Sequence, residues 1–221
     1  MTPPPSPTTA ELAARRAEMV ETQLRRRNIT SSAVLEAMGR VSREAFIPAD
    51  LRHAAYRDSP LPIAEQQTIS QPYIVAYMLE ALGLTGGERV LEVGTGSGYG
   101  AAVLAEIAAE VYTVERHRSL ADRARTIIAQ LGYSNVEVLW ADGTKGWPGA
   151  APYGGIVVTA AGAAVPDDLK TQLAIGGRLV IPVGTALFQT LMCITRLDRD
   201  HYREESLCGV RFVPLIGDLA R

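Results

Sequence analysis

The stretch Val90-Leu-Glu-Val-Gly-Thr-Gly-Ser-Gly-Tyr-Gly100 decides the fold of this chain. Its first four residues predict a buried strand that carries one acid, Glu92, and glycines follow at every second position from Gly94. The Ala-rich run 101–109 then predicts a helix. Glycine permits positive φ and leaves room for a ligand near the backbone, and the helix N-terminus faces that ligand. The order of strand, loop and helix therefore predicts a nucleotide-type binding site.

Two acids help to choose the ligand of this loop. Glu92 lies in the strand just before the glycines, where an NAD site has no particular need of a carboxylate. Glu115 ends the next apolar run, Val111–Val114, roughly 20 residues on, where a carboxylate can hold ribose hydroxyls. A cationic amino-acid end and a ribose would suit this pair, so the residue types favour S-adenosylmethionine and leave NAD as the alternative.

The rest of the chain alternates between apolar runs and helical segments. Strands are expected at 90–93, 111–114, 136–140, 156–159 and 178–183, with helices at 99–107 and 119–131 and a short helix from Pro166. This pattern predicts an α/β fold with a mostly parallel central sheet and helices on both faces. Phe188–Thr195 and Ser206–Phe212 have no helix between them and predict an antiparallel C-terminal hairpin.

Ligands bind at the carboxyl ends of parallel strands. Glu92, Glu115, Asp142 and Thr159 all lie at or near such ends, which supports one shared site.

The N-terminal third of the sequence predicts a second polar site. Helices are expected at Ala10–Arg27, from Ser31 or Ser32 to Met38, and at Tyr73–Leu82. In the later helix 119–131, Ser119 and Asp122 are expected to form a capping pair. The polar run Gln67–Gln71 leads into Pro72 at a helix start. Ser70 is therefore either an N-cap or a hydroxyl that, with nearby backbone N–H groups, receives an anion.

Composition sets the class of protein. The chain has 221 residues, 47% hydrophobic residues and a net charge of −2, so neither nucleic acid nor a membrane is an expected partner. Residues 1–9 predict a disordered tail, and residues 10–221 predict one domain, divided into a helical and lid region (10–82) and a cofactor-binding core (83–221). Cys193 and Cys208 show no metal-ligand spacing and suit a reduced pair of thiols. A cytoplasmic monomer is expected.

Several stretches together carry a resemblance that extends over nearly the whole chain. They are Arg43–Pro48, Tyr56–Asp58, Leu61–Ile63, Gln67–Tyr73, the glycine loop, Val157–Ala161, Gly176–Gly184 and Val210–Leu215. In these stretches the chain resembles the protein-L-isoaspartate (D-aspartate) O-methyltransferase family. The glycine loop is common to many methyltransferases, whereas Thr68-Ile-Ser70 and Arg211-Phe-Val-Pro-Leu215 are specific to this family.

The resemblance implies a Rossmann-like class I methyltransferase fold and a reaction. S-adenosyl-L-methionine would methylate the α-carboxylate of L-isoaspartyl residues, and the side-chain carboxylate of D-aspartyl residues, in damaged proteins. S-adenosyl-L-homocysteine would be the product, and the ester would initiate repair through a succinimide.

The resemblance also implies site residues. The catalytic residue would be Ser70, and no metal is implied. Cofactor contacts would be Gln67, Thr68, Ile69, Glu92, Gly94, Thr95, Gly96, Ser97, Gly98, Glu115, Arg116, Asp142, Gly143 and Thr159. Substrate contacts would be Ser70, Ala160, Ala161, Val213, Pro214 and Leu215.

Four positions depart from the family pattern. Ala64 and Gln66 stand where glycines are expected, Gly154 where a polar residue is common, and Gly100 where Gln is usual. These departures leave two alternatives to repair: a related carboxyl methyltransferase with a dedicated peptide or small-molecule substrate, and a non-catalytic cofactor-binding protein.

Overall fold

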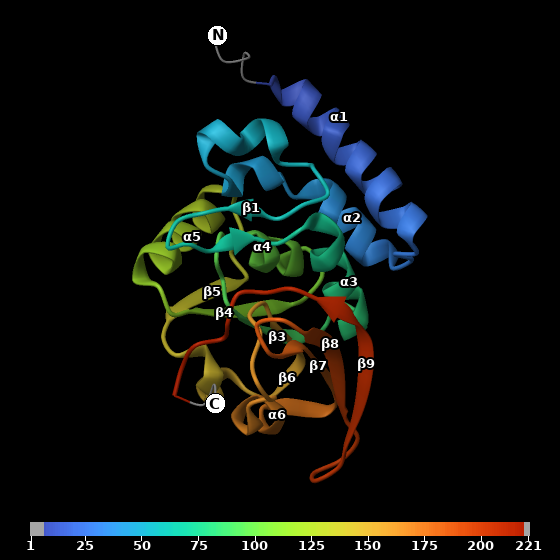
Figure 1. Cartoon of the computed structure of the whole chain (residues 1–221), viewed down its shortest axis with the longest axis vertical. Helices are drawn as coiled ribbons and strands as arrows, with labels where there is room; N and C mark the ends of the chain where they lie inside the picture. Colours follow the sequence, from blue (N-terminus) through green and yellow to red (C-terminus); the bar gives the residue numbers. More distant parts are fainter. Residues whose placement is uncertain (1–6, 219–221) are drawn as a thin grey trace.

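A seven-stranded sheet forms the centre of the protein (Figure 1). The computed structural model describes residues 7–218. The strands are β3 (Arg89–Val93), β4 (Glu110–Glu115), β5 (Val136–Trp140), β6 (Tyr153–Val158), β7 (Leu173–Gly184), β8 (Gln189–Arg196) and β9 (Tyr202–Val210). Their order is β5-β4-β3-β6-β7-β8-β9. The pairs from β5 to β7 are parallel, and β7, β8 and β9 pair antiparallel, which confirms the predicted mostly parallel sheet with a C-terminal hairpin.

Helices and a short hairpin surround this sheet. The helices are α1 (Thr9–Met19), α2 (Ser32–Arg40), α3 (Pro72–Leu82), α4 (Tyr99–Ala105), α5 (Arg118–Gln130) and α6 (Asp167–Thr171). The strands β1 (Leu61–Pro62) and β2 (Thr68–Ile69) form an antiparallel hairpin that lies above α4 and α5 in Figure 1. The N-terminal third of the chain therefore lies over one side of the sheet rather than forming a separate unit.

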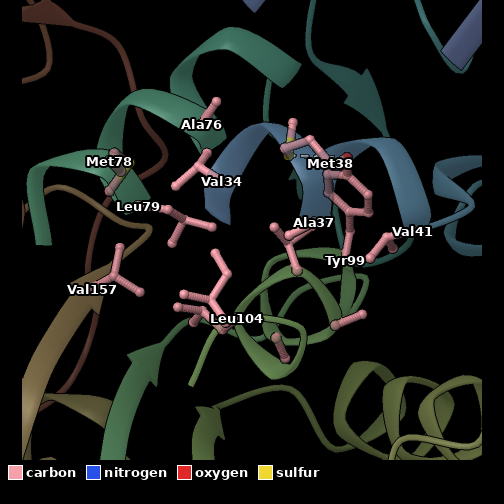
Figure 2. Close-up of a cluster of buried hydrophobic side chains, with 14 of the residues drawn as sticks. Val34, Ala37, Met38, Val41, Ala76, Met78, Leu79, Tyr99, Leu104 and Val157 are labelled. Carbon is pink, nitrogen blue, oxygen red and sulfur yellow. Dashed lines mark hydrogen bonds between the residues drawn. The ribbon is translucent and has the colours of Figure 1, made fainter. Parts of the chain in front are cut away.

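Alternating residues of the strands enter two different apolar layers, because successive side chains of a strand point to opposite faces. Val90 and Val111 join a large cluster with α2, α3 and α4. Figure 2 shows part of it, with Val34 and Met38 from α2 beside Leu79 from α3 and Leu104 from α4. Leu91 belongs to a smaller cluster on the other face, which α6 covers through Leu169. Both faces are thus buried, as the continuous apolar runs predict.

The N-terminal helix differs from the prediction at both ends. Thr8 caps α1 through a capping box with Glu11, so the helix begins inside the tail expected over 1–9; residues 1–6 of that tail lie outside the described part. The expected helix 10–27 continues beyond α1 as a π-helical turn (Val20–Leu24) and a 3-10 turn (Arg25–Arg27). Asn28 ends it with φ +66°, a conformation that Asn tolerates.

The structure contradicts the cap predicted for the start of α5. The prediction made Ser119 and Asp122 a capping pair, but His117 is the N-cap and makes no side-chain cap bond. The Ser119 hydroxyl donates instead to Glu65 of the β1–β2 loop at 2.5 Å, and Asp122 accepts from Arg125. The tertiary contact with the hairpin, which the local sequence does not reveal, replaces the expected cap.

Two strands begin four or more residues earlier than expected. β7 begins at Leu173 rather than Arg178, and β9 begins at Tyr202 rather than Ser206. In both cases a neighbouring strand supplies the pairing: Tyr153 pairs with Leu173, and Tyr202 pairs with Arg196. The predicted charged connection between β8 and β9 is correspondingly shorter. No helix within residues 7–218 has the length and apolar character needed to cross a bilayer.

Candidate active site

A cavity of about 980 Å³ opens at the carboxyl ends of β3, β4 and β6. Its wall comes from segments that are far apart in the sequence: 67–71, 92–97, 114–117, 159–160, 187–190 and 209–216. The cavity lies where the sheet order reverses, because the connection after β3 leads to β4 on one side and the connection after β6 leads to β7 on the other. Such a switch point is where open parallel sheets bind ligands.

At the switch point, Thr159 connects the loop after β6 to the loop after β3 through hydrogen bonds. Its backbone N–H donates to the carbonyl of Val93 at 2.9 Å, and its hydroxyl donates to the carbonyl of Gly94 at 2.7 Å. A Cβ atom on Gly94 would collide with this hydroxyl. The loop after β3 is therefore held open by contacts that only glycine permits at position 94.

The glycine loop needs glycine for its backbone conformation at three positions. Gly94, Gly96 and Gly98 have φ of +96°, +53° and +91°. The left-handed region is costly for residues with a Cβ atom, and most of all for β-branched ones. Gly94 and Gly96 lie on the cavity wall, whereas Gly98 packs against Ala124 of α5 behind it. The loop thus turns its backbone, not side chains, toward the cavity.

Glu92 is a buried carboxyl on the cavity wall. Its side chain is 2% exposed, and the Thr113 hydroxyl, which also lies 2.6 Å from the Thr95 hydroxyl, donates to it at 2.7 Å. Burial raises the pKa of Glu92 to about 8, against the opposing effect of the Thr113 hydrogen bond and with a smaller contribution from the charge of Glu115. A cationic group in the cavity would stabilise the ionised form of this carboxyl.

Glu115 holds the loops around the cavity. One carboxylate oxygen accepts from the Gly96 amide at 2.8 Å and the other from the His117 amide at 2.9 Å. Each oxygen has lone pairs left for further donors such as ribose hydroxyls. Glu115 therefore both shapes the glycine loop and presents acceptors to the cavity.

Ser70 also lines the cavity, from the link between β2 and α3. The N-cap of α3 is Gln71, so the alternative that made Ser70 an N-cap is wrong. Within residues 7–218 the Ser70 hydroxyl has no hydrogen-bond partner, while its backbone carbonyl accepts from the Arg43 guanidinium at 2.7 Å. The hydroxyl is thus available to a ligand in the cavity.

The model of the protein-L-isoaspartate(D-aspartate) O-methyltransferase family matches residues 14–220. This chain belongs to that family. It is 57% identical to protein-L-isoaspartate O-methyltransferase 1 of Rhodopseudomonas palustris (strain HaA2), over 98% of this chain and 89% of that protein. It is 58% identical to protein-L-isoaspartate O-methyltransferase 2 of Pelobacter propionicus, over 92% and 91% of the two chains.

Solved structures agree with this membership. A protein-L-isoaspartate O-methyltransferase superposes with a TM-score of 0.83 at 30% identity, over 92% of this chain and 67% of that one. A Plasmodium falciparum protein assigned to the same activity, and crystallised with S-adenosyl-L-homocysteine, superposes with a TM-score of 0.80 at 26% identity, over 91% and 98% of the two chains. The predicted class I methyltransferase fold is confirmed.

Most of the residues that the family resemblance implies line one cavity. On the cofactor side they are Gln67, Thr68, Ile69, Glu92, Gly94, Thr95, Gly96, Ser97, Glu115, Arg116, Gly143 and Thr159; on the substrate side they are Ser70, Ala160, Val213, Pro214 and Leu215. The residue types also fit the donor: a buried acid for a cationic amino-acid end, a second acid for ribose hydroxyls, and glycines where side chains would fill the space.

Three implied residues do not line the cavity, because protein contacts occupy them. Gly98 packs behind the loop. The Asp142 carboxylate accepts from the Thr144 amide at 2.9 Å and from the Asp218 amide at 2.8 Å, so it anchors the C-terminal segment. Ala161 is buried and exchanges backbone hydrogen bonds of 2.8 Å with Val213 and Leu215, and so supports the substrate side from behind.

Several cavity residues were missed by the sequence analysis. His117 lines the cavity, and its Nε2 atom is buried with no partner among residues 7–218. Leu187 and Phe188, in the turn between β7 and β8, lie at the rim with side chains 85% and 82% exposed. Two adjacent apolar residues in a turn between strands could have indicated the cavity rim from the sequence. No local sequence feature distinguishes His117.

The departures from the family pattern have structural explanations. Gln66 and its neighbour Glu65 have φ of +56° and +58°, so the loop keeps a backbone conformation natural for glycine although neither residue is one. Glu65 is held there by the Ser119 hydroxyl. At Gly154, a Cβ atom would meet the Glu88 side chain at 2.7 Å, which leaves little room for the usual polar residue.

Gly100 provides the first testable prediction. A Cβ atom at this position would collide with a carboxylate oxygen of Glu92. We expect Gly100→Ala to displace that carboxyl and to weaken S-adenosyl-L-homocysteine binding by roughly tenfold, about the effect of one misplaced charge-assisted hydrogen bond. Isothermal titration calorimetry measures the change. Gly87→Ala, at an open position before β3 and outside the cavity wall, is the control, and equal affinities for the two variants would contradict the prediction.

Glu92 provides a prediction about pH. With its pKa near 8 the free carboxyl is mostly protonated at pH 7, and a bound cation favours the ionised form, so binding releases a proton. We expect S-adenosyl-L-homocysteine affinity to rise from pH 6 toward pH 8 and then to level off. Calorimetry in two buffers of different ionisation enthalpy measures the number of protons released on binding. Glu92→Gln removes the release; if the wild-type protein releases none, the assignment of Glu92 is wrong.

Proposed function

We propose that this protein transfers a methyl group from S-adenosyl-L-methionine to the α-carboxylate of L-isoaspartyl residues, and to the side-chain carboxylate of D-aspartyl residues, in damaged proteins. The observation that carries the proposal is that Glu92, Glu115, the glycine loop and Ser70 all line one cavity. Family membership over residues 14–220 supports the same activity. The methyl ester formed on the substrate initiates repair through a succinimide.

The chain needs no general base for this reaction. An isoaspartyl or aspartyl carboxyl group has an ordinary pKa of about 3.5–4 and is already ionised at neutral pH. S-adenosyl-L-methionine, when bound, supplies a methyl group activated by the positive charge of its sulfonium. The residues of the chain have to orient the carboxylate, hold the donor pocket and exclude water, and such positioning can contribute several kcal/mol.

Ser70 is the residue that we propose orients the acceptor. Its free hydroxyl can donate one hydrogen bond to a substrate carboxylate oxygen, and the backbone N–H groups at the start of α3 lie nearby. A neutral donor holds the carboxylate in place without the strong ion pair that an arginine would form, so the carboxylate stays reactive. Glu92 and Glu115 are proposed to bind the two ends of the donor.

The substrate side is proposed to offer few directional contacts. Val213, Pro214 and Leu215 line the cavity, and Ala161 already engages the Val213 carbonyl and the Leu215 N–H. Pro214 has no N–H, so this largely apolar wall suits substrates of varied sequence. This feature favours a repair role over a dedicated peptide.

The decisive experiment compares two peptides that differ only in one linkage. The protein is incubated with radiolabelled S-adenosyl-L-methionine and either an isoaspartyl peptide or the same peptide with normal aspartate. We expect base-labile methyl incorporation into the first peptide alone. Equal labelling of both, or of neither, would contradict the proposal.

We further propose that the protein acts as a cytoplasmic monomer. One chain supplies every wall of the cavity described above, so the site does not require a second copy. Cys193 and Cys208 are free thiols, and β8 and β9 pair them with Glu205 and Leu191 rather than with each other, as suits a reducing compartment. Analytical ultracentrifugation tests the monomer.

A further inference from the structure

Arg43 is a fully buried arginine that reaches two distant carbonyls. It begins the 3-10 turn Arg43–Phe46 and is 0% exposed. Its Nε atom donates to the carbonyl of Ala55 at 2.8 Å, and its Nη2 atom donates to the carbonyl of Ser70 at 2.7 Å. One side chain therefore connects the turn at 43–46, the segment before β1 and the residue that faces the substrate.

The same guanidinium also contacts the cofactor side of the site. Its central carbon lies 4.8 Å from the centre of the Tyr99 ring. Tyr99 is the first residue of α4 and directly follows the glycine loop. The ring is held in turn by Phe46, edge-on at 5.7 Å, and by Met38, whose sulfur accepts from the Tyr99 hydroxyl at 3.4 Å. Figure 2 shows Tyr99 between α4 and α2, beside Met38.

Packing alone does not explain a buried arginine at position 43, because burying its charge costs folding free energy. Within residues 7–218 no carboxylate forms a salt bridge with it, and its Nη1 atom is buried without a hydrogen-bond partner. Burial lowers its pKa to about 10, which leaves it cationic at neutral pH. A buried cation without a counterion destabilises the fold relative to an apolar side chain of similar size. Its contacts therefore suggest a role besides stability.

We propose that Arg43 is a positioning residue that fixes the Ser70 backbone at a set distance from the glycine loop. Ser70 lies in the two-residue link between β2 and α3, and the cap residue Gln71 makes no side-chain bond to the helix. The Gln71 side chain donates instead to the carbonyl of Asp58 at 3.2 Å, so the hydrogen bond from Arg43 is the side-chain restraint on Ser70 itself. The Tyr99 contact relates this restraint to the donor pocket. Displacement of a reacting group by about 1 Å can cost a hundredfold in rate.

The inference rests on the proposed role of Ser70, and the test distinguishes a failure of the Arg43 inference from a failure of that proposed role. The variants are Arg43→Met, Arg43→Lys, Ser70→Ala and the double variant Arg43→Met/Ser70→Ala. The matched control is Arg178→Met, because Arg178 donates to the carbonyl of Ala81 at 3.1 Å, at the opposite end of α3. Four quantities are measured: kcat, KM for an isoaspartyl peptide, S-adenosyl-L-homocysteine affinity, and hydrogen exchange of the amides at 68–71.

We expect Arg43→Met to lower kcat by about ten- to a hundredfold, with cofactor affinity within about threefold of wild type. Arg43→Lys keeps the charge and one donor and should recover part of the loss. In the Ser70→Ala background, Arg43→Met should lower kcat by less than about twofold, because both changes act on the same hydroxyl. Amides at 68–71 should exchange faster in Arg43→Met and remain unchanged in Arg178→Met.

Other results overturn the inference. Equal kcat losses in Arg43→Met and Arg178→Met, or independent effects in the double variant, would make Arg43 a purely structural residue. Unchanged exchange at 68–71 would refute the restraint even if the wild-type protein methylated no isoaspartyl peptide, and in that case the proposed function would fail separately. If Arg43→Met does not fold, the same comparisons with Arg43→Lys decide.

Discussion

Gly96→Val is expected to lower S-adenosyl-L-homocysteine affinity by at least about a hundredfold, equivalent to about 2.7 kcal/mol. Gly96 has φ +53°, where a β-branched residue is strongly disfavoured, and its amide donates to Glu115 at 2.8 Å. The protein itself would leave room, since the nearest atom to a Cβ there is Cδ1 of Ile63 at 3.8 Å. The valine would therefore rotate the loop, break the Glu115 contact and occupy donor space.

The control for Gly96→Val is Gly132→Val. Gly132 has φ +83°, and a Cβ atom there meets no other atom within 4 Å, so the variant reproduces the backbone strain away from the cavity. We expect both variants to lose thermal stability, measured by circular dichroism, and only Gly96→Val to lose affinity in calorimetry. An affinity of Gly96→Val within threefold of wild type would refute the placement of the donor beside this loop.

Ser70→Ala should lower kcat by roughly ten- to a thousandfold with little change in cofactor affinity. The variant removes one positioned hydrogen-bond donor, and losses of that size are typical when a single such donor is removed. The Ser70 hydroxyl has no partner among the described residues, so the folded chain should lose little stability. Initial rates with an isoaspartyl peptide at saturating donor measure kcat.

A capping serine provides the control for Ser70→Ala. Ser31 is the N-cap of α2 and accepts from the Val34 amide at 3.4 Å. Ser31→Ala should cost about 1 kcal/mol of unfolding free energy and leave kcat unchanged, which is the inverse of the result expected for Ser70→Ala. Wild-type turnover by Ser70→Ala would remove Ser70 from the active site.

The predicted site residues divide according to what surrounds them. Glu92 and Glu115 lie where the sequence placed them, because the carboxyl ends of neighbouring parallel strands meet at one edge of the sheet. Asp142 also follows a strand end, yet its carboxylate binds the Asp218 amide, which is distant in sequence. No local pattern distinguishes an acid that faces a cavity from one that caps a remote backbone amide.

The sequence by itself determined the class of fold, the glycine loop and the family. Apolar periodicity and the backbone demands of glycine are local properties, so they can be read from consecutive residues. Only the tertiary structure decided that Arg43 holds the Ser70 carbonyl, that the Ser119 hydroxyl donates to Glu65 instead of capping α5, and that Gly100 makes room for Glu92. Each of these depends on which distant segments the sheet brings together, and short-range patterns do not encode that pairing.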